Sequence, residues 1–278
     1  MLRSAKLAPN FDYATLERFW RDADELGFHA VWDYDHFYGL RDPEAPTLEG
    51  WTLLGAMAKV ISRARIGCMV TGVTYRHPAV LANMASAVDH ISGGRLEFGL
   101  GAAWYQPEHD AYGIEFPSAG TRIDMLDEAC ELIRRLWTED RVDHRGRFWT
   151  LTDAMSNPKP VQQHVPMVIG GAGEKKTLRV VAKRADEWNW TGSWDPQGGP
   201  EEFARLSGIL DDHCAASGRD PAEIRRSMQL FLQPEDDQQT KAQLVALDEY
   251  EMRGVGHVVL AFVTPPSREL LESVAGLA

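Results

Sequence analysis

Short apolar runs alternate eight times along the chain with longer segments in which apolar residues recur every three or four positions. The short runs predict strands, and the runs RIGCMVT and HVVLAFV are apolar throughout, as in strands buried on both faces. We expect strands at 4–9, 30–33, 65–71, 95–99, 167–170, 187–190, 227–232 and 257–263.

The segments between these runs predict helices. Asp12 precedes a periodic segment that Gly27 ends, and Pro78 stands where a first helical turn tolerates proline. Further helices are expected at about 121–137, 173–184, 200–217, 238–253 and 267–277. Strands that alternate with helices pair in parallel, because each crossover needs a helix. Eight such units in 278 residues predict one domain, 1–278, folded as a (β/α)₈ TIM barrel.

One connection is longer than the others. More than 60 residues separate the fourth and fifth expected strands, and a single helix accounts for fewer than 20 of them. The remainder is rich in aromatic residues, including Trp104, Tyr105 and Phe116. We expect an insertion at 101–165 that serves as a lid or an interface.

Composition limits the classes of function. The net charge of -12 would repel a phosphate backbone, so we expect no binding to nucleic acid. No apolar run reaches the roughly 20 residues that span a bilayer, and the first ten residues lack the apolar core of a signal peptide. Cys68, Cys130 and Cys214 lie far apart and predict buried side chains in a reducing compartment. We expect a soluble, cytoplasmic protein. The first strand lies close to Met1, which is compatible with a natural start further upstream.

The clearest candidate site is the glycine-rich loop after the fifth strand. In a barrel, function lies at the carboxyl ends of the strands. Here Gly170, Gly171, Ala172 and Gly173 lead into a helix whose free N–H groups suit a phosphate, and Lys175 adds positive charge. The alternative is that these glycines only form a tight turn.

Asp35 and His36, after the second strand, are the best candidates for proton transfer. An imidazole can hold or pass a proton near neutral pH, and a neighbouring carboxylate can tune it. The alternative is a capping aspartate beside a packed histidine. Trp104 replaces the third glycine of a dinucleotide-binding pattern, so it indicates a wall for a flat ring or plain packing. We expect no metal site and no serine hydrolase, because neither an HExxH nor a Gly-x-Ser-x-Gly pattern occurs.

Taken together, the chain resembles the bacterial luciferase-like monooxygenase family, in its branch that uses the deazaflavin coenzyme F420. The matching pieces are 27–37, 49–58, 62–104, 108–137, 166–189 and 218–224, and they include RHP, DHISGGR and IGGAGEK. The resemblance implies a TIM barrel with the coenzyme ring in its mouth. It places the ring on a bulge near Met69, Val70 and Thr71, commonly with a cis non-prolyl peptide, and the phosphate at the glycine loop.

The resemblance also implies a role for His36 near the reactive ring, with Asp35 and Trp104 among the coenzyme contacts. It implies a homodimer, a small-molecule substrate and a separate enzyme that reduces the coenzyme. Two departures stand out. Some deazaflavin-linked sugar dehydrogenases of this fold carry a catalytic glutamate where this chain has Trp104, and Ala103 replaces a glycine common among relatives.

The sequence therefore predicts a coenzyme F420-dependent oxidoreductase that moves a hydride between the deazaflavin and a small organic molecule. One rival is a monooxygenase that uses reduced FMN and dioxygen, with the same fold and site. The other rival is a coenzyme-binding protein without turnover. The identity of the substrate does not follow from the sequence.

Overall fold

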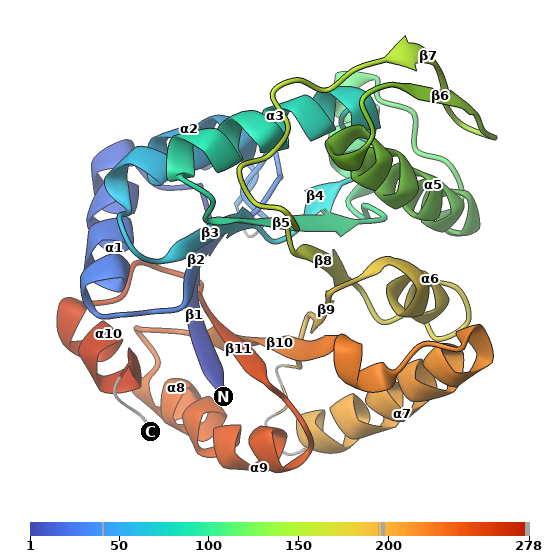
Figure 1. Cartoon of the computed structure of the whole chain (residues 1–278). Helices are drawn as coiled ribbons and strands as arrows, with labels where there is room; N and C mark the ends of the chain where they lie inside the picture. Colours follow the sequence, from blue (N-terminus) through green and yellow to red (C-terminus); the bar gives the residue numbers. More distant parts are fainter. Residues whose placement is uncertain (41, 194, 196–197, 276–278) are drawn as a thin grey trace.

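Eight parallel strands close into a barrel in the computed structural model, as the sequence predicts (Figure 1). The structure describes residues 1–40, 42–193, 195 and 198–275. Strand β3 pairs with both β2 and β5, which closes the ring. The strands are β1 (Leu2–Leu7), β2 (Ala30–Asp33), β3 (Arg65–Cys68), β5 (Leu96–Gly101), β8 (Met167–Gly170), β9 (Glu187–Trp190), β10 (Arg225–Leu232) and β11 (His257–Phe262).

The expected strand 65–71 is wrong at its carboxyl end. Strand β3 ends at Cys68, and pairing resumes only in the short β4 (Thr71–Gly72), which hydrogen-bonds to β5. Between them the backbone leaves the sheet at Met69 and Val70 and forms a bulge, and the peptide bond between these two residues is cis. An unbroken apolar run carries no sign of such an interruption. The family resemblance implied a bulge with a cis non-prolyl peptide near these residues, and the structure confirms it.

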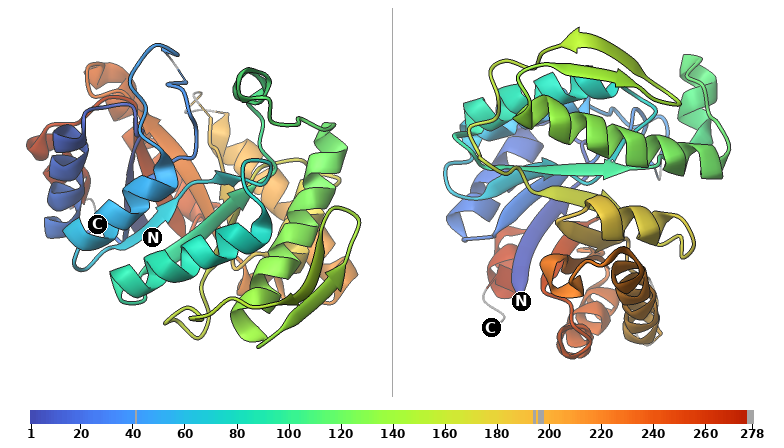
Figure 2. Two further views of the ribbon diagram at one scale, coloured as in Figure 1. Left: turned by 90° about the horizontal axis from the view of Figure 1, so that it is seen from above. Right: turned by 45° about the vertical axis from the view of Figure 1, so that its right-hand side comes forward.

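Helices surround the barrel (Figures 1 and 2). Asp12 caps the first one, because its Oδ1 accepts a hydrogen bond of 3.0 Å from the backbone N–H of Thr15. The helices outside the insertion are α1 (Tyr13–Glu25), α2 (Gly50–Val60), α3 (Pro78–Ser92), α6 (Thr177–Arg184), α7 (Gly199–Ser217), α8 (Asp237–Val245), α9 (Leu247–Met252) and α10 (Arg268–Ala275). The expected helix 238–253 is thus two helices, and the one expected at 173–184 begins only at Thr177, after a turn.

The insertion between β5 and β8 contains more regular structure than predicted. It holds α4 (Gln106–Tyr112), α5 (Ala119–Thr138) and an antiparallel hairpin of β6 (Val142–Arg145) and β7 (Thr150–Ala154). The hairpin lies beside α5 (Figure 2). Its turn is fixed there because the Glu128 carboxylate accepts hydrogen bonds from the backbone N–H groups of Phe148 and Trp149.

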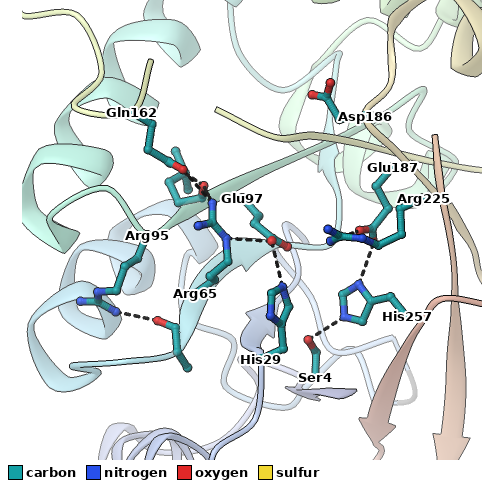
Figure 3. A network of polar contacts seen from close by, with 12 residues as sticks. Ser4, His29, Arg65, Arg95, Glu97, Gln162, Asp186, Glu187, Arg225 and His257 are labelled. Atoms are coloured by element: carbon teal, nitrogen blue, oxygen red, sulfur yellow. Dashed lines mark hydrogen bonds and ion pairs between the residues drawn. The ribbon is translucent and has the colours of Figure 1, made fainter. Parts of the chain in front are cut away.

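Ion pairs close the barrel interior at the end where the strands begin (Figure 3). Arg65 Nε lies 2.8 Å from Glu97 Oε1, and His29 Nε2 lies 3.3 Å from the same oxygen. On the other side, His257 Nδ1 lies 2.9 Å from Glu187 Oε1. Burial raises the pKa of Glu97, but the neighbouring histidines and Arg65 more than offset it, so the pKa lies below its ordinary value. Buried charges in this network are therefore paired.

Bulky apolar side chains fill the middle of the barrel, above the ion pairs. Trp32 is fully buried there and packs with Val168, Val259 and Met69. A Cβ at Gly67 would lie 2.3 Å from the Trp32 ring, so a glycine is required where the indole crosses the barrel. Met69, the first residue of the bulge, thus stands on a packed floor.

The remaining sequence expectations concern the cysteines and membrane spans. Cys68, Cys130 and Cys214 are free thiols and are buried, as predicted. Within the described part of the chain, no helix combines the length and the apolar character needed to cross a membrane.

Candidate functional site

A cavity of about 710 Å³ opens at the carboxyl ends of the barrel strands. The bulge after β3, the loop after β2, the start of the loop after β8 and the ends of β10 and β11 all contribute to its wall. In the left view of Figure 2, the loop after β2 and helix α4 rise on the same side of the barrel. Of the predicted site residues, the cavity brings together Asp35, His36, Met69, Val70, Thr71, Trp104, Gly170 and Gly171.

In the bulge, the side chain of Val70 forms a platform at the cavity, and glycines of the neighbouring strands leave room for it. A Cβ at Gly101 would lie 2.7 Å from Val70 Cγ2, and one at Gly170 would lie 3.0 Å from the same atom. A Cβ at Gly99 would lie 2.0 Å from the Cys68 carbonyl oxygen. Any of these side chains would force Val70 or the bulge backbone to move. Because these three residues have no side chain, Val70 and the bulge backbone have the space that they occupy at the cavity.

Two side chains form hydrogen bonds to the residues on either side of Val70. Trp51 Nε1 donates a hydrogen bond of 2.8 Å to Thr71 Oγ1. Lys6 Nζ donates to the Met69 carbonyl at 3.1 Å and to Gln229 Oε1 at 2.7 Å. Burial is the main reason that the pKa of Lys6 falls to about 8. Sequence reasoning missed Lys6, because a single lysine in a strand gives no sign that it points into the barrel.

His36 is oriented by a buried glutamate that lies 72 positions further along the chain. His36 Nδ1 lies 2.9 Å from Oε2 of Glu108, which belongs to α4 and is fully buried. This contact leaves Nε2 as the ring nitrogen available to the cavity that His36 lines. The His36 ring also packs edge-on against Trp104, with 5.6 Å between the ring centroids. Trp104 itself is 63% exposed.

Four hydrogen bonds hold the Glu108 carboxylate. Oε1 accepts from the backbone N–H groups of Phe37 at 2.7 Å and Tyr38 at 3.0 Å. Oε2 accepts from Tyr75 Oη at 2.6 Å, in addition to His36. Burial raises the pKa of Glu108, but the donors from His36, Tyr75 and Tyr38 outweigh it and hold the pKa below its ordinary value. An ionised Glu108 accepts a hydrogen bond from Nδ1–H of His36. The basic lone pair of the neutral imidazole therefore lies on Nε2.

Asp35 lies in the cavity wall, but its carboxylate forms an ion pair with Arg76. Arg76 donates to Oδ2 at 2.5 Å and to Oδ1 at 3.0 Å, and it also pairs with Glu49. Burial raises the pKa of Asp35 despite the opposing effect of Arg76. The bidentate pair fixes the start of the loop that carries His36. Direct contact between Asp35 and a coenzyme stays a prediction.

The glycine loop after β8 is divided between two spaces. Gly170 and Gly171 face the cavity, whereas Ala172, Gly173 and Lys175 line an adjoining hollow. Gly171 has a φ of 130°, which favours glycine, and its carbonyl accepts a hydrogen bond of 2.7 Å from Trp188 Nε1. The backbone N–H of Gly171 donates to the Asn189 carbonyl at 3.1 Å, so a phosphate would meet the N–H groups that follow Gly171 in the loop.

Sequence reasoning missed the partners of the predicted residues. Glu108, Tyr75 and Arg76 support the site without having been assigned a role. The sequence did contain a signal for Glu108. Glu108 and His109 follow shortly after the fourth expected strand, whose carboxyl end lies at the barrel mouth. Across the described residues, no group of three or more His, Cys, Asp or Glu side chains is arranged to hold a metal ion.

The fold and this cavity define a class: TIM-barrel proteins with a bulge, a glycine loop and an oriented histidine at one mouth. The chain belongs to the luciferase-like monooxygenase family, whose model matches residues 2–265. The match covers most of the chain and confirms the family that the sequence motifs indicate.

Among the similar proteins are F420-dependent dehydrogenases and a monooxygenase. An F420-dependent glucose-6-phosphate dehydrogenase of Kineococcus radiotolerans is 31% identical over 83% of this chain and 67% of its own. Pyrimidine monooxygenase RutA of Klebsiella pneumoniae is 29% identical over 80% of this chain and 59% of its own. Several mycobacterial relatives match at 34% identity, and the aligned part spans 58% of their length. An F420-dependent secondary alcohol dehydrogenase, solved with an F420–acetone adduct, shares the fold over 100% of this chain and 98% of its own, with a TM-score of 0.83 at 18% identity.

Proposed function

We propose that this protein is a coenzyme F420-dependent oxidoreductase that transfers a hydride between the deazaflavin and a small organic substrate. The observation that carries the proposal is the shared cavity. The Val70 platform, the Gly170–Gly171 backbone and the free nitrogen of His36 all face this one space. A flat ring, its phosphate and a proton-transferring group can therefore meet there.

The residues present fit such a coenzyme. The Val70 platform offers an apolar surface for a flat ring. Gly101 and Gly170 lack the side chains that would displace Val70. The glycine loop and the start of α6 would hold the phosphate through backbone N–H groups. When bound, a deazaflavin supplies hydride exchange at its central ring. The protein orients the partners and excludes water from the floor of the cavity.

His36 would handle the proton that accompanies the hydride. Glu108 fixes the imidazole so that Nε2 faces the cavity, where it can accept a proton from a substrate hydroxyl or return one to a carbonyl oxygen. The Glu108 carboxylate stabilises the imidazolium that forms when Nε2 takes the proton. Glu108 is therefore a positioning residue, and His36 is the candidate catalytic residue.

The FMN-dependent monooxygenase is the second candidate, and the relationship to RutA favours it. It would use the same platform and loop with reduced FMN and dioxygen. We favour coenzyme F420 because several relatives of comparable identity are named F420-dependent dehydrogenases. The third possibility, coenzyme binding without turnover, gives no reason for an imidazole oriented by a buried carboxylate.

Titration of the purified apoprotein with coenzyme F420 and with FMN, followed by fluorescence, tests the choice. We expect coenzyme F420 to bind at least about tenfold more tightly, a difference of about 1.4 kcal/mol. FMN binding more tightly by that margin would establish the monooxygenase candidate instead. Tight binding of coenzyme F420 with no turnover across a broad panel of alcohols and ketones would support the binding protein.

Our further proposals concern the setting of this activity. We propose that residues 1–278 form one domain, that the protein is a cytoplasmic homodimer and that a separate enzyme supplies the reduced coenzyme. Gel filtration with light scattering checks the dimer, for which a mass of about twice the 31.1 kDa of the chain is expected.

A further inference from the structure

Lys6 is a buried lysine whose ammonium group contacts the bulge. It belongs to β1, lines the cavity and is only 9% exposed. Its Nζ donates to the carbonyl of Met69 at 3.1 Å and to Oε1 of Gln229 at 2.7 Å. Gln229 also lines the cavity, and its Nε2 donates to Oδ1 of Asn189 at 3.0 Å, which turns the amide oxygen toward Lys6. The ammonium group is therefore held in one place, beside the residue that precedes Val70.

The neighbours of this cation are neutral. A carbonyl and an amide oxygen accept its two hydrogen bonds, and the centroid of the Tyr34 ring lies 5.7 Å from Nζ. Cys68 and Asp33 are the acidic groups near enough to act on its charge. Burial raises the pKa of each well above its ordinary value, which favours their neutral forms. No carboxylate of the described residues forms an ion pair with Lys6.

A buried charge is costly unless an opposite charge accompanies it. The carboxylate of Asp35, in the same cavity, has such a partner in Arg76. Lys6 has none, although two of its three N–H groups find acceptors among the described residues, which leaves one for a ligand. The other cation in the lining, Arg122, belongs to the insertion and donates to the Ala102 carbonyl. A negatively charged ligand beside the bulge would thus supply the missing counter-ion of Lys6.

We propose that Lys6 is the counter-ion of the ionised deazaflavin ring of coenzyme F420. This ring carries a hydroxyl group that can lose its proton to water, and conjugation spreads the resulting negative charge to the pyrimidine carbonyl. The ring of FMN has no such hydroxyl. Because Lys6 donates to the carbonyl of Met69, a ring on the Val70 platform would lie with one edge close to the ammonium group. The inference rests on the proposed function, since it takes the ring to lie on this platform.

Absorption titration of the bound coenzyme tests the proposal, because the ring and its anion absorb at different wavelengths. Coenzyme F420 is bound at saturation to the wild type and to Lys6→Met. The wild-type titration stays below the pKa of Lys6, about 8, so that the lysine remains a cation. The wild-type ring should lose its proton at a pH about one unit or more lower than the ring in Lys6→Met, because a nearby opposite charge favours the ionised form of an acid.

A comparison within the wild type makes the test independent of the variant. The bound ring should lose its proton at a pH no higher than that of coenzyme F420 free in solution. A buried ring without a counter-ion would instead need a higher pH, because burial disfavours the charged form. A higher midpoint for the bound ring would therefore overturn the proposal even if Lys6→Met failed to fold.

Lys159→Met is the matched control. Lys159 Nζ also donates to two oxygens, the carbonyls of Leu136 and Glu139, but it is not among the described residues that line the cavity. This variant should titrate like the wild type. Fluorescence titration gives a second measurement: at neutral pH, Lys6→Met should bind coenzyme F420 roughly tenfold more weakly and FMN within about twofold of the wild type.

The remaining outcomes separate the alternatives. Equal midpoints in the wild type and Lys6→Met would overturn the proposal. Equal losses of affinity for coenzyme F420 and FMN would also overturn it, and would leave Lys6 as a hydrogen-bond donor to any ring. Binding of acetate to the coenzyme-loaded wild type but not to loaded Lys6→Met would assign the cation to a substrate carboxylate instead. Binding of FMN without binding of coenzyme F420 would refute the proposed function itself.

Discussion

Oε2 of Glu108 lies 2.9 Å from Nδ1 of His36 and joins helix α4 to the loop after β2 at the edge of the cavity. The pair sets the tautomer of the imidazole. A glutamine at position 108 could donate its amide N–H to Nδ1, which would place the ring proton on Nε2 and remove the free lone pair. Glu108→Gln should therefore lower turnover by about 10²-fold or more, with coenzyme affinity changed only a few-fold.

Nitrogen-15 NMR of the His36 ring reports this change directly, since the two tautomers differ in their nitrogen shifts. Glu128→Gln is the matched control, because Glu128 also pairs with a histidine and with backbone N–H groups, but in the insertion hairpin. That variant should keep normal turnover. An unaltered tautomer in Glu108→Gln, together with full activity, would mean that Glu108 serves only to anchor the loop.

Removal of the imidazole itself addresses the proton transfer. His36→Ala should bind coenzyme within a few-fold of the wild type and turn over roughly 10²–10⁴-fold more slowly, the usual contribution of a positioned acid or base. Steady-state kinetics and coenzyme titration measure the two quantities separately. Unchanged turnover would assign His36 to packing against Trp104.

The platform is open to a test by steric substitution and rescue. Gly101→Ala would bring a Cβ to 2.7 Å from Val70 Cγ2 and should push the platform into the space for the ring. Overpacking of this kind costs about 1–3 kcal/mol, so coenzyme affinity should fall roughly tenfold. Val70→Ala in the same protein removes the clash and should restore much of the affinity. No recovery in the double variant would show that the loss of affinity does not come from the contact between position 101 and Val70.

The glycine loop has its own test. Gly171→Val introduces a branched side chain at a φ of 130°, with the new Cβ 3.0 Å from Thr177 Cγ2. Phosphate-dependent binding should fall sharply while the melting temperature stays close to that of the wild type, because the loop lies at the rim. Riboflavin, which lacks the phosphate of FMN, is the control ligand. Equal losses for FMN and riboflavin would show that the loop shapes the ring site, and an unfolded variant would make these glycines turn residues only.

Lys6 gives a pH-dependent prediction for stability. Its pKa is about 8 in the folded protein and about 10.4 in an unfolded chain, so between these values the unfolded state binds more protons. Stability from this group is therefore lower below the folded pKa and rises with pH. Lys6→Met lacks this term, so wild-type protein should gain roughly 2 kcal/mol relative to the variant between about pH 8 and pH 10.

Urea denaturation of both proteins across this range measures the difference, in which the other titrating groups cancel. A difference in free energy of unfolding that stays constant with pH would show that Lys6 is not held as a buried cation beneath the platform.

The fold was predictable because it depends on periodicity. Apolar runs and helical spacing locate the barrel strands and most helices within a few residues. The bulge at Met69 and Val70 was not predictable from the residues alone, since an apolar residue in a strand and one in a bulge look the same. Its basis lies in glycines from β5 and β8, which only the closed barrel brings together.

The site was predictable in its exposed members and not in its supports. His36 and the glycine loop follow strand ends, so their position at the mouth follows from the topology. Glu108 stands among polar residues of a short helix and resembles a surface residue, yet it is fully buried once α4 folds against the loop after β2. Burial of a charge depends on distant partners, which single-sequence patterns do not contain.

The ion pairs around Glu97 and Glu187 close the barrel interior at the end where the strands begin, and the cavity lies at the other end. Val70, Trp104 and His36 all line the cavity at the opposite end of the barrel. A ring on the platform would lie between the packed floor of the barrel and the residues of the loops at its mouth. If the coenzyme ring rests on the Val70 platform, we expect the coenzyme to bind before the substrate, and product-inhibition kinetics measure this order.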